Sequence, residues 1–457
     1  MLLLLAAVRF TPSADLLSER DAVIKALSST TDIQIQKIES QRDSLTLRSA
    51  QSATLPQLSI NISSLLNDSA TLNVATGTLS QSLPGGGRLF GTAEHQFGTQ
   101  WHSSSNMSNT RFTVGVEQPL LKSAWSHAPV RTGIKITSLN NEILSIQRER
   151  SILSELSKIR NLYWSVYEQK QLERIIQSRL DQTKEHYMTE QQRYRLGEAS
   201  PLDTLSAALQ YVNAQRTLLS SRNTARNTLF RLASALRTDV ESIVLPDSAD
   251  LTVPDIPEPQ QFIDLARRYD PQIQILQRMQ ELTALQVRQR HNNLLPEINV
   301  RTSYTHEQRR PDPFYDDNFS WGNGSVQFVL NYSLPAVSAR AEKQKQELSL
   351  LINEYNTEQH SIDQAYYLEE LRERWHQDTV QLEFADLSVE LAQQQYEAVK
   401  HGYELGTEDR LSLIAAQNDL AAAKVSAIQA KIELKRFQIV FEEITGTLFE
   451  RFGVQLQ

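Results

Sequence analysis

Apolar positions along the chain follow two different periods, and the changes between these periods mark the predicted elements. From residue 15 to about residue 53 apolar side chains recur at helical spacing, and an irregularity near Asp32 allows a break there. Leu55-Pro56 ends this helix because proline disfavours helical backbone at the residue before it. From Leu58 to Ser63, and again from Arg111 to Glu117, apolar and polar residues alternate, which predicts two half-buried strands.

Two far longer helices are predicted after these strand regions. From about residue 122 to residue 194 the helical spacing shows no convincing break after Pro129, which gives a helix of about 73 residues. At about 1.5 Å per residue, such a helix is on the order of 110 Å long. A second long helix is predicted from about residue 336 to residue 403. These lengths far exceed the average of about 11 residues in globular proteins, and they favour coiled-coil packing.

The chain repeats this order of elements. Leu295-Pro296 matches Leu55-Pro56, and residues 297–304 and 326–334 alternate as two more strands. The turn after each long helix also recurs, with Tyr194-Arg195-Leu196-Gly197 matching Tyr403-Glu404-Leu405-Gly406 at a constant offset of 209 residues (403 minus 194). A long match at one offset indicates a duplicated unit. Gly197 and Gly406 are predicted turn formers, and Leu202 and Leu411 occupy matching positions just beyond the two turns.

The repeat sets the predicted domain boundaries. Residues 1–14 are either the remnant of a signal peptide or a disordered N-terminus, and residues 15–244 form the first repeat. Residues 245–259 are a proline-rich linker, residues 260–448 the second repeat, and residues 449–457 a C-terminal tail. Each repeat is therefore predicted to contain a medium helix, two strands, a very long helix, a turn and a further medium helix.

The four predicted strands are each about 9 to 10 residues long, which is the length of a tilted strand that crosses a bilayer. Four strands are too few to close a transmembrane barrel, which needs about eight. An open sheet edge cannot lie in lipid, so a membrane location requires strands from several copies. The distance between the flanking prolines is 24 residues greater in the first repeat (119 minus 56, against 335 minus 296), which predicts a larger extracellular loop or hairpin around Pro84 to Gly87.

Composition excludes several classes of function. The chain of 457 residues has a net charge of −8, which argues against nucleic acid as a partner, and it contains no cysteine for disulfides or thiolate chemistry. The nine histidines are scattered and show no metal-ligand spacing. There is no HExxH, Walker A, nucleophile-elbow or Rossmann pattern. We therefore expect no catalytic residue, metal or cofactor, and we expect the protein not to be an enzyme.

The order, spacing and duplication of these motifs resemble the TolC-like outer-membrane efflux protein family, over almost the whole chain. The motifs are Leu55-Pro56-Gln57-Leu58, Gln118-Pro119-Leu120-Leu121, Tyr194-Arg195-Leu196-Gly197 with Leu202-Asp203, Asp270-Pro271, Leu295-Pro296, Leu334-Pro335 and Tyr403-Glu404-Leu405-Gly406.

The resemblance implies a mainly α fold with a β-barrel part. Long helices would form a coiled-coil barrel, and four strands per chain would enter a twelve-stranded transmembrane β-barrel shared by a homotrimer. The protein would lie in the outer membrane of a Gram-negative bacterium, in contact with lipid, with a periplasmic extension. Its partners would be a periplasmic adaptor protein and an inner-membrane pump.

The resemblance also implies that the two turns lie at a periplasmic tip, where the channel is gated. Position by position, Asp203 and Tyr403 match the residues that hold such a tip closed, and Glu408, Asp409 and Arg410 supply charges nearby. The simpler interpretation is that Asp203 is a helix-start acid favoured by the helix dipole and that Tyr403 packs in a helix seam.

Two functions remain in competition at this point. The first is a passive exit duct for efflux or secretion, supplied by the pump through the adaptor. The second is a soluble, elongated coiled-coil scaffold whose short strands form small sheets. The faces of the strands distinguish the two, because a lipid-facing strand needs an unbroken apolar face.

Overall fold

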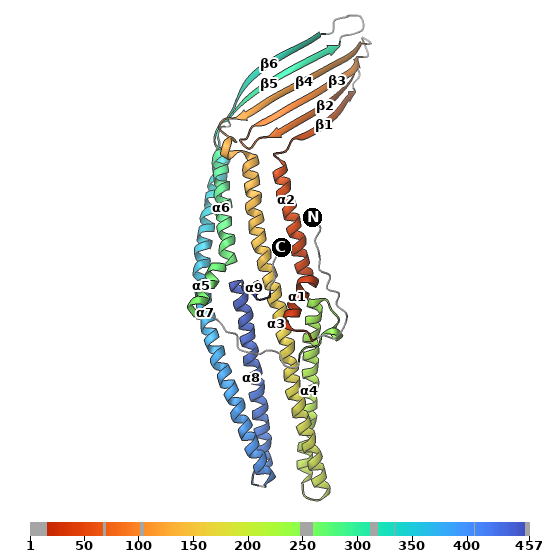
Figure 1. Ribbon diagram of the computed structural model, residues 1–457, viewed down its shortest axis with the longest axis vertical. Coiled ribbons are helices and arrows are strands. Elements are labelled where there is room, and N and C mark those ends of the chain that lie inside the picture. The colour runs from red at the N-terminus through yellow and green to blue at the C-terminus, as the bar shows by residue number, and fades with distance from the viewer. Residues whose placement is uncertain are drawn as a thin grey trace. The chain divides into compact units, whose positions relative to one another are not determined.

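The computed structural model describes residues 16–66, 70–100, 105–246, 259–310, 319–332, 334–405 and 407–452. This part of the chain consists of helices, several of them very long, and one antiparallel sheet of six strands (Figure 1). Among the described residues, no helix is both long and apolar enough to cross a membrane.

The first half contains four strands between its helices. Its elements are α1 (Glu19–Ser29), α2 (Thr31–Ser52), β1 (Gln57–Leu66), β2 (Ala70–Ser82), β3 (Arg88–Gln100), β4 (Ser105–Pro119), the 3₁₀ helix η1 (Trp125–His127), α3 (Pro129–Arg195) and α4 (Pro201–Leu236). The break expected near Asp32 occurs at Thr30. The long helix begins at Pro129 and not at residue 122, because η1 occupies part of the preceding segment.

The second half contains two strands and repeats the helical order. Its elements are the 3₁₀ helix η2 (Val240–Ser242), α5 (Pro259–Tyr269), α6 (Pro271–Asn292), β5 (Glu297–Arg310), β6 (Phe319–Asn331), α7 (Val337–Glu404), α8 (Arg410–Thr445) and α9 (Leu448–Phe452). Asp270-Pro271 separates α5 from α6, because a proline inside a helix removes a hydrogen bond and clashes with the preceding turn. Most of the proline-rich linker lies outside the described residues.

The sheet contains six strands, so the prediction of four strands per chain is wrong. The strands pair in chain order, and β2 and β3 form a hairpin inserted between β1 and β4. A hairpin turn was expected around Pro84 to Gly87, and this turn is confirmed, with Leu83 N–H donating to the carbonyl of Gly87 over 2.7 Å. The hairpin strands themselves escaped prediction because Ala, Gly, Ser and Thr fill many of their positions, which weakens the apolar alternation.

The turn of this hairpin lies at the end of the sheet to which the helices attach, and not at the opposite end as expected. Gly85 accepts a hydrogen bond from the backbone N–H of Trp125 at 2.9 Å and one from the side chain of Gln118 at 3.1 Å. Gln118 lies at the end of β4, and Trp125 lies in η1 between β4 and α3. The hairpin is therefore anchored to the chain that leads into the long helix.

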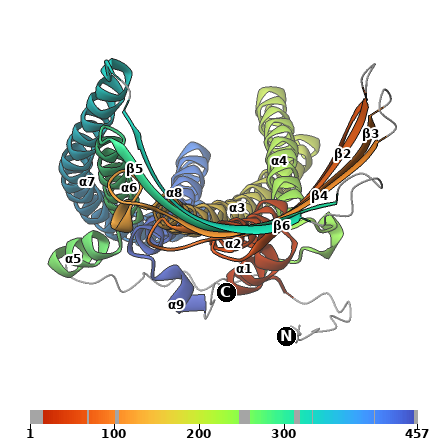
Figure 2. The ribbon, with the colours of Figure 1, turned by 90° about the horizontal axis from the view of Figure 1, so that it is seen from above.

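The six strands present one polar and one apolar face. On the polar face Arg111 lies 3.3 Å from Glu307 and 3.9 Å from Glu94, and the hydroxyls of Thr113 and Thr305 are 3.1 Å apart. The opposite face carries exposed apolar side chains from the strands: Leu58, Ile60, Ile62, Leu79, Leu89, Phe112, Val114, Val116, Tyr304, Val326, Phe328 and Leu330. The sheet is curved along its width (Figure 2).

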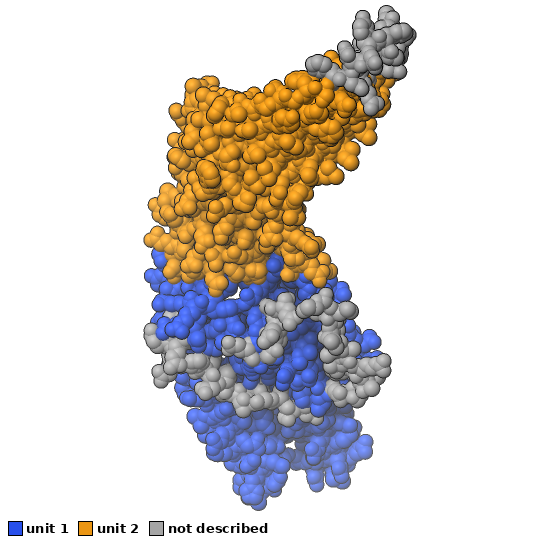
Figure 3. Space-filling view, turned by 45° about the horizontal axis from the view of Figure 1, so that its top comes forward, with its two compact units in different colours: residues 1–37, 148–271, 362–457 blue, residues 38–147, 272–361 orange. Residues whose placement is uncertain are grey.

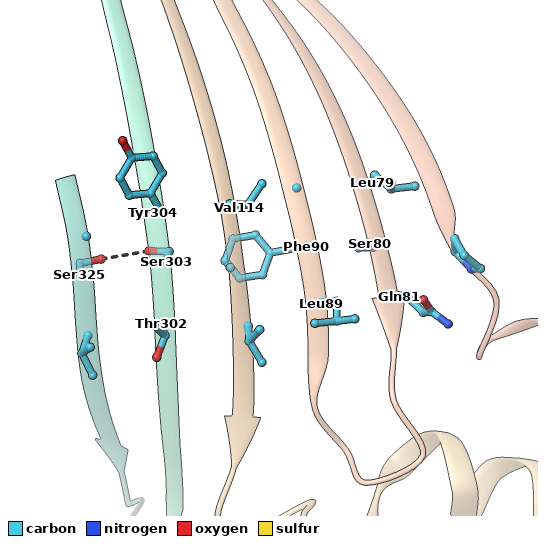
Figure 4. Close-up of a pocket in the computed structure, with 16 residues that line it drawn as sticks. Leu79, Ser80, Gln81, Leu89, Phe90, Val114, Thr302, Ser303, Tyr304 and Ser325 are labelled. Atoms are coloured by element: carbon cyan, nitrogen blue, oxygen red, sulfur yellow. Dashed lines mark hydrogen bonds between the residues drawn. The ribbon is translucent and has the colours of Figure 1, made fainter. Parts of the chain in front are cut away.

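A hollow of about 780 Å³ interrupts the apolar face (Figure 4). The strand register aligns Leu79, Gly91, Val114, Tyr304 and Gly324 in one row across five strands. Gly91 and Gly324 have no side chain, so the row is unfilled at these two positions beside the larger residues. The hollow is thus a consequence of glycine positions on an otherwise apolar surface, and its lining provides no cluster of polar groups for a specific ligand.

The chain divides into two compact units, and each unit takes segments from both predicted repeats (Figure 3). One unit comprises residues 38–147 and 272–361 and contains the sheet. The other comprises residues 1–37, 148–271 and 362–457 and contains the two helical turns. Its main core includes these buried residues: Leu153, Leu156, Ile159, Tyr163, Trp164, Leu232, Leu236, Ile432 and Ile439.

A buried arginine lies beside this core. Arg160 of α3 is 1% exposed, and it lies 2.5 Å from Glu19 of α1 and 2.7 Å from Glu442 of α8. Arg451 also contacts Glu442, and the guanidinium of Arg160 lies over the ring of Phe452. A charge removed from water must be paired, since leaving one partner alone costs several kcal/mol. This cluster therefore holds helices from the two ends of the sequence in one arrangement.

We expect Arg160→Met to lower the free energy of unfolding by about 3–5 kcal/mol, because the partly buried Glu19 would lose its cationic partner and the buried Glu442 would keep only Arg451. The matched control is Lys158→Met on the same helix, whose side chain is 68% exposed and whose ion pair with Glu155 contributes about 0–1 kcal/mol. Thermal or denaturant unfolding of the purified variants measures both values. Similar losses in the two variants would show that Arg160 has no special structural role.

Candidate functional site at the two helical turns

The turn between α3 and α4 is a helix ending built around Gly197 (Figure 1). Glu198 N–H donates to the carbonyl of Arg193 at 2.8 Å, and Gly197 N–H donates to that of Tyr194 at 3.0 Å. This pair of bonds is the Schellman motif, which requires a left-handed residue after the helix. Gly197 supplies it with φ of +79°, so its predicted role as a turn former is confirmed.

The helix after this turn begins with a reciprocal cap between Ser200 and Asp203. The backbone N–H of Asp203 donates to the hydroxyl of Ser200 at 3.2 Å, and the carboxylate of Asp203 accepts from the backbone N–H of Ser200 at 3.2 Å. The Ser200 hydroxyl also donates to this carboxylate at 2.8 Å. These hydrogen bonds lower the pKa of Asp203, and the positive charges of Arg410 and Arg193 lower it further. Asp203 is therefore a capping residue that also lies within the field of two arginines.

The turn between α7 and α8 uses a different cap. Asp409 is the residue before α8, and its carboxylate accepts a hydrogen bond from the backbone N–H of Ser412 at 2.7 Å, which lowers the pKa of Asp409. Thr407 and Glu408 donate backbone hydrogen bonds to the carbonyl of Gly402, so both residues belong to the folded turn. Gly406 lies outside the described residues, and its role as a turn former stays a prediction.

A buried carboxylate links the two turns. Glu190 of α3 is 1% exposed and lies 3.3 Å from the guanidinium of Arg410 at the start of α8. Its other oxygen lies 3.4 Å from Arg193 on its own helix. We call Glu190, Arg193, Asp203 and Arg410 the turn cluster. It joins the end of one long helix to the start of the helix after the other turn.

His186 lies one helical turn before Glu190 and faces the same charges. Burial lowers the pKa of His186, the charge of Arg410 lowers it further, and Glu190 opposes both effects. Its neutral form is therefore favoured in the folded protein. Together with Arg179, Asn213 and Gln417 it lines a cavity of about 260 Å³ between α3, α4 and α8.

The structure brings some of the predicted gate residues together and leaves others apart. Arg410 and Asp203 lie in one cluster, whereas Asp409 and Glu408 serve the α7–α8 turn. In the described part of the chain, Tyr403 is half-buried and makes no hydrogen bond to Asp203. Sequence patterns do not single out Glu190, which is one of many charged residues along α3. Its burial is visible only when α8 is placed against α3.

Apolar side chains at both turns are exposed to solvent. Leu202 and Leu411, which occupy matching positions in the repeat, are 74% and 75% exposed, and Leu196 and Leu405 are 67% and 66% exposed. Leucine side chains at such a level of exposure contribute little to the core of a single chain. Their matched placement at both turns marks a candidate contact surface.

The described residues contain no group of three or more His, Cys, Asp or Glu side chains positioned to hold a metal ion. The turns consequently present a surface of capped helix ends, exposed leucines and a charge cluster. Such a surface is suited to contacts with proteins, and the described residues of the turns show no arrangement of nucleophile and base.

Comparisons with known proteins agree with this architecture. Residues 262–447 match the family model described as outer membrane efflux protein. No curated protein sequence matches the chain.

Three solved outer-membrane proteins illustrate the structural similarity. The CmeC outer membrane channel of Campylobacter jejuni has 14% identity and a TM-score of 0.69, with 96% of this chain and 90% of that chain covered. The outer membrane protein VceC of Vibrio cholerae has 11% identity and a TM-score of 0.68, with 96% of this chain and 97% of that chain covered. The MtrE outer membrane channel of Neisseria gonorrhoeae has 14% identity and a TM-score of 0.62, with 94% of this chain and 89% of that chain covered.

The resemblance inferred from the sequence is thereby confirmed: residues 262–447 match the outer membrane efflux protein family, and nearly the whole chain has the fold of these outer-membrane proteins.

Proposed function

We propose that this protein is the outer-membrane exit duct of an efflux or secretion system. The observation that carries the proposal is the six-stranded sheet with one polar and one exposed apolar face. A lipid-facing strand needs such an apolar face, and a water-filled lumen needs a polar one. The family match of the second repeat supports the same function.

The exposed face argues against the soluble scaffold. Ile60, Ile62 and Phe328 are 72%, 74% and 73% exposed, and further apolar residues surround them on the same face. Soluble proteins rarely expose a contiguous apolar patch larger than a few hundred Å². Lipid tails would cover this apolar surface.

The edges of the sheet support an assembly of several copies. β1 and β6 are the two edge strands, and each has one side without a paired strand in the sheet. Their free N–H and C=O groups would be costly in hydrocarbon, so the sheet needs neighbours before it can lie in a membrane. In line with the family resemblance, we propose a homotrimer in the outer membrane of a Gram-negative bacterium, with the helical turns in the periplasm.

The two turns are the proposed docking and gating site. The exposed leucines at both turns would bind a periplasmic adaptor protein that connects the channel to an inner-membrane pump. The turn cluster would hold the hairpins together in the closed state, with Asp203, Arg410 and Glu190 as its charged contacts. The pump would supply the energy, and the duct itself would have no catalytic role.

Membrane fractionation tests the basic proposal. We expect the protein in the detergent-extracted outer-membrane fraction as a trimer that forms conductive pores in planar bilayers. Recovery as a soluble monomer without detergent would reject the channel and favour the scaffold.

The gate makes a first specific prediction. Glu190→Gln should raise single-channel conductance, because Arg193 and Arg410 would lose their shared buried counter-charge and repel each other. The Asp203→Asn/Tyr403→Phe double variant should also raise single-channel conductance. The matched control is Arg222→Gln, which removes the exposed ion pair with Glu173 between α3 and α4. Unchanged conductance of the Glu190→Gln channel in a properly assembled trimer would contradict a gating role for the cluster.

The exposed leucines make a second prediction. Leu202→Glu/Leu411→Glu should reduce adaptor binding by at least tenfold, because two charges would enter an apolar contact, while pore conductance stays unchanged. Binding is measured with the purified adaptor on immobilised trimers. Leu202→Met/Leu411→Met is the conservative control and should retain binding. Equal binding by the glutamate and methionine variants would exclude these leucines from the docking surface.

A further inference from the structure

We infer that the β2–β3 hairpin is a structural part of the channel wall, so that three copies close a barrel of eighteen strands (three times six) and not twelve. This inference rests on the homotrimer proposed above. It changes the expected size of the pore through the membrane.

The hairpin is paired along its whole length. β2 pairs with β1 over ten residues and with β3 over thirteen, and β3 pairs with β4 over thirteen. The neighbouring pair β4–β5 is joined over twelve residues. The inserted strands are therefore bonded to the sheet as completely as the strands beside them.

The division into two faces continues through the hairpin. Leu79 and Leu89 fall on the apolar face, in register with Leu58 and Val116. Thr78, Thr92 and Glu94 fall on the polar face. A slip of one residue in the strand register would exchange the two faces. The hairpin keeps the register that matches its neighbours, which an insertion folded away from the wall would have no need to do.

One side chain of the hairpin is built into the neighbouring strands. Phe90 of β3 lies over Gly115 of β4, because a Cβ atom added to Gly115 would stand 2.5 Å from the Phe90 ring. The guanidinium of Arg301 from β5 lies 4.6 Å from the centre of the same ring. Gly115 thus provides the space for Phe90, and Arg301 covers it by a cation–π contact. Phe90 therefore connects β3 with the two strands β4 and β5.

The edges of the six-stranded sheet suit closure by further copies of the chain. All neighbouring pairs are antiparallel, so β6 runs opposite to β1, and the β6 edge of one copy can pair with the β1 edge of the next. Val326 and Phe328 of β6 lie on the same face as Ile60 and Ile62 of β1. Head-to-tail pairing therefore continues one apolar belt and closes into a ring.

The number of strands determines the width of the barrel. With strands about 4.8 Å apart and tilted by about 40°, eighteen strands give a backbone diameter of about 36 Å, against about 24 Å for twelve. Barrels of 16–18 strands leave an aqueous channel in porins. The membrane section of this duct would then be wider than a twelve-stranded wall allows. The narrowest point for a passing substrate would lie outside the membrane section.

Disulfide crosslinking tests the position of the hairpin in the native membrane, and the cysteine-free chain provides a clean background. The pairs Ser59→Cys/Thr78→Cys and Thr92→Cys/Thr113→Cys join the hairpin to β1 and β4. Thr113→Cys/Thr305→Cys is the control for the β4–β5 pair. We expect all three pairs to form intrachain disulfides. Efficient crosslinking of Ser59→Cys/Thr113→Cys, with failure of the first two pairs, would place β1 beside β4 and overturn the inference.

Single-particle reconstruction of the detergent-purified trimer counts the strands directly. Eighteen strands support the inference, and a trimer with twelve strands and an extruded hairpin overturns it while leaving the channel intact. A soluble monomer would instead reject the proposed channel, and the eighteen-stranded closure with it. The crosslinks and the strand count therefore distinguish failure of the eighteen-stranded closure from failure of the proposed channel.

Discussion

The backbone of the two edge strands imposes the main constraint on this protein. Every N–H and C=O group needs a partner where water is absent, and the free sides of β1 and β6 have none within the sheet. The apolar face of the same sheet is exposed in the single chain, so it needs a cover as well. Pairing of the edges between copies would satisfy the first requirement, and surrounding lipid the second. In a membrane, a single chain would satisfy neither requirement, and its sheet would need further copies of the chain.

Among the helices, the main constraint is the burial of charged side chains. Arg160 joins α1, α3 and α8 through Glu19 and Glu442, and Glu190 joins α3 to α8 near the turns. Both sites place an ion where water is nearly excluded, and neither ion is stable there without its partner. The two clusters differ in their surroundings. Arg160 lies beside a large apolar core, whereas the turn cluster includes Arg193, which is 44% exposed, so its contacts can be exchanged at a smaller cost.

The sequence predicted those features that depend on local chemistry. Pro56 and Pro271 ended or began helices as proline geometry requires, and Gly197 adopted the left-handed backbone expected of it. The β2–β3 hairpin was missed because alternation is hard to see where Gly77, Gly91 and alanines replace large apolar residues. The Glu190–Arg410 pair joins residues 220 positions apart (410 minus 190), and no local pattern indicates which of the many charges on α3 would become buried.

The two turns show why matching positions in a repeat need not have the same role. In the first turn Ser200 is the cap and Asp203 completes the reciprocal pair, while in the second Asp409 is itself the cap and Ser412 donates to it. The carboxylate of Asp203 therefore holds the start of α4, and its pKa is also lowered by the charge of Arg410. Its substitution changes both the helix end and the charge cluster. Glu190 lies within α3 and has no capping role, so its substitution changes its ion pairs with Arg193 and Arg410 without changing a helix cap.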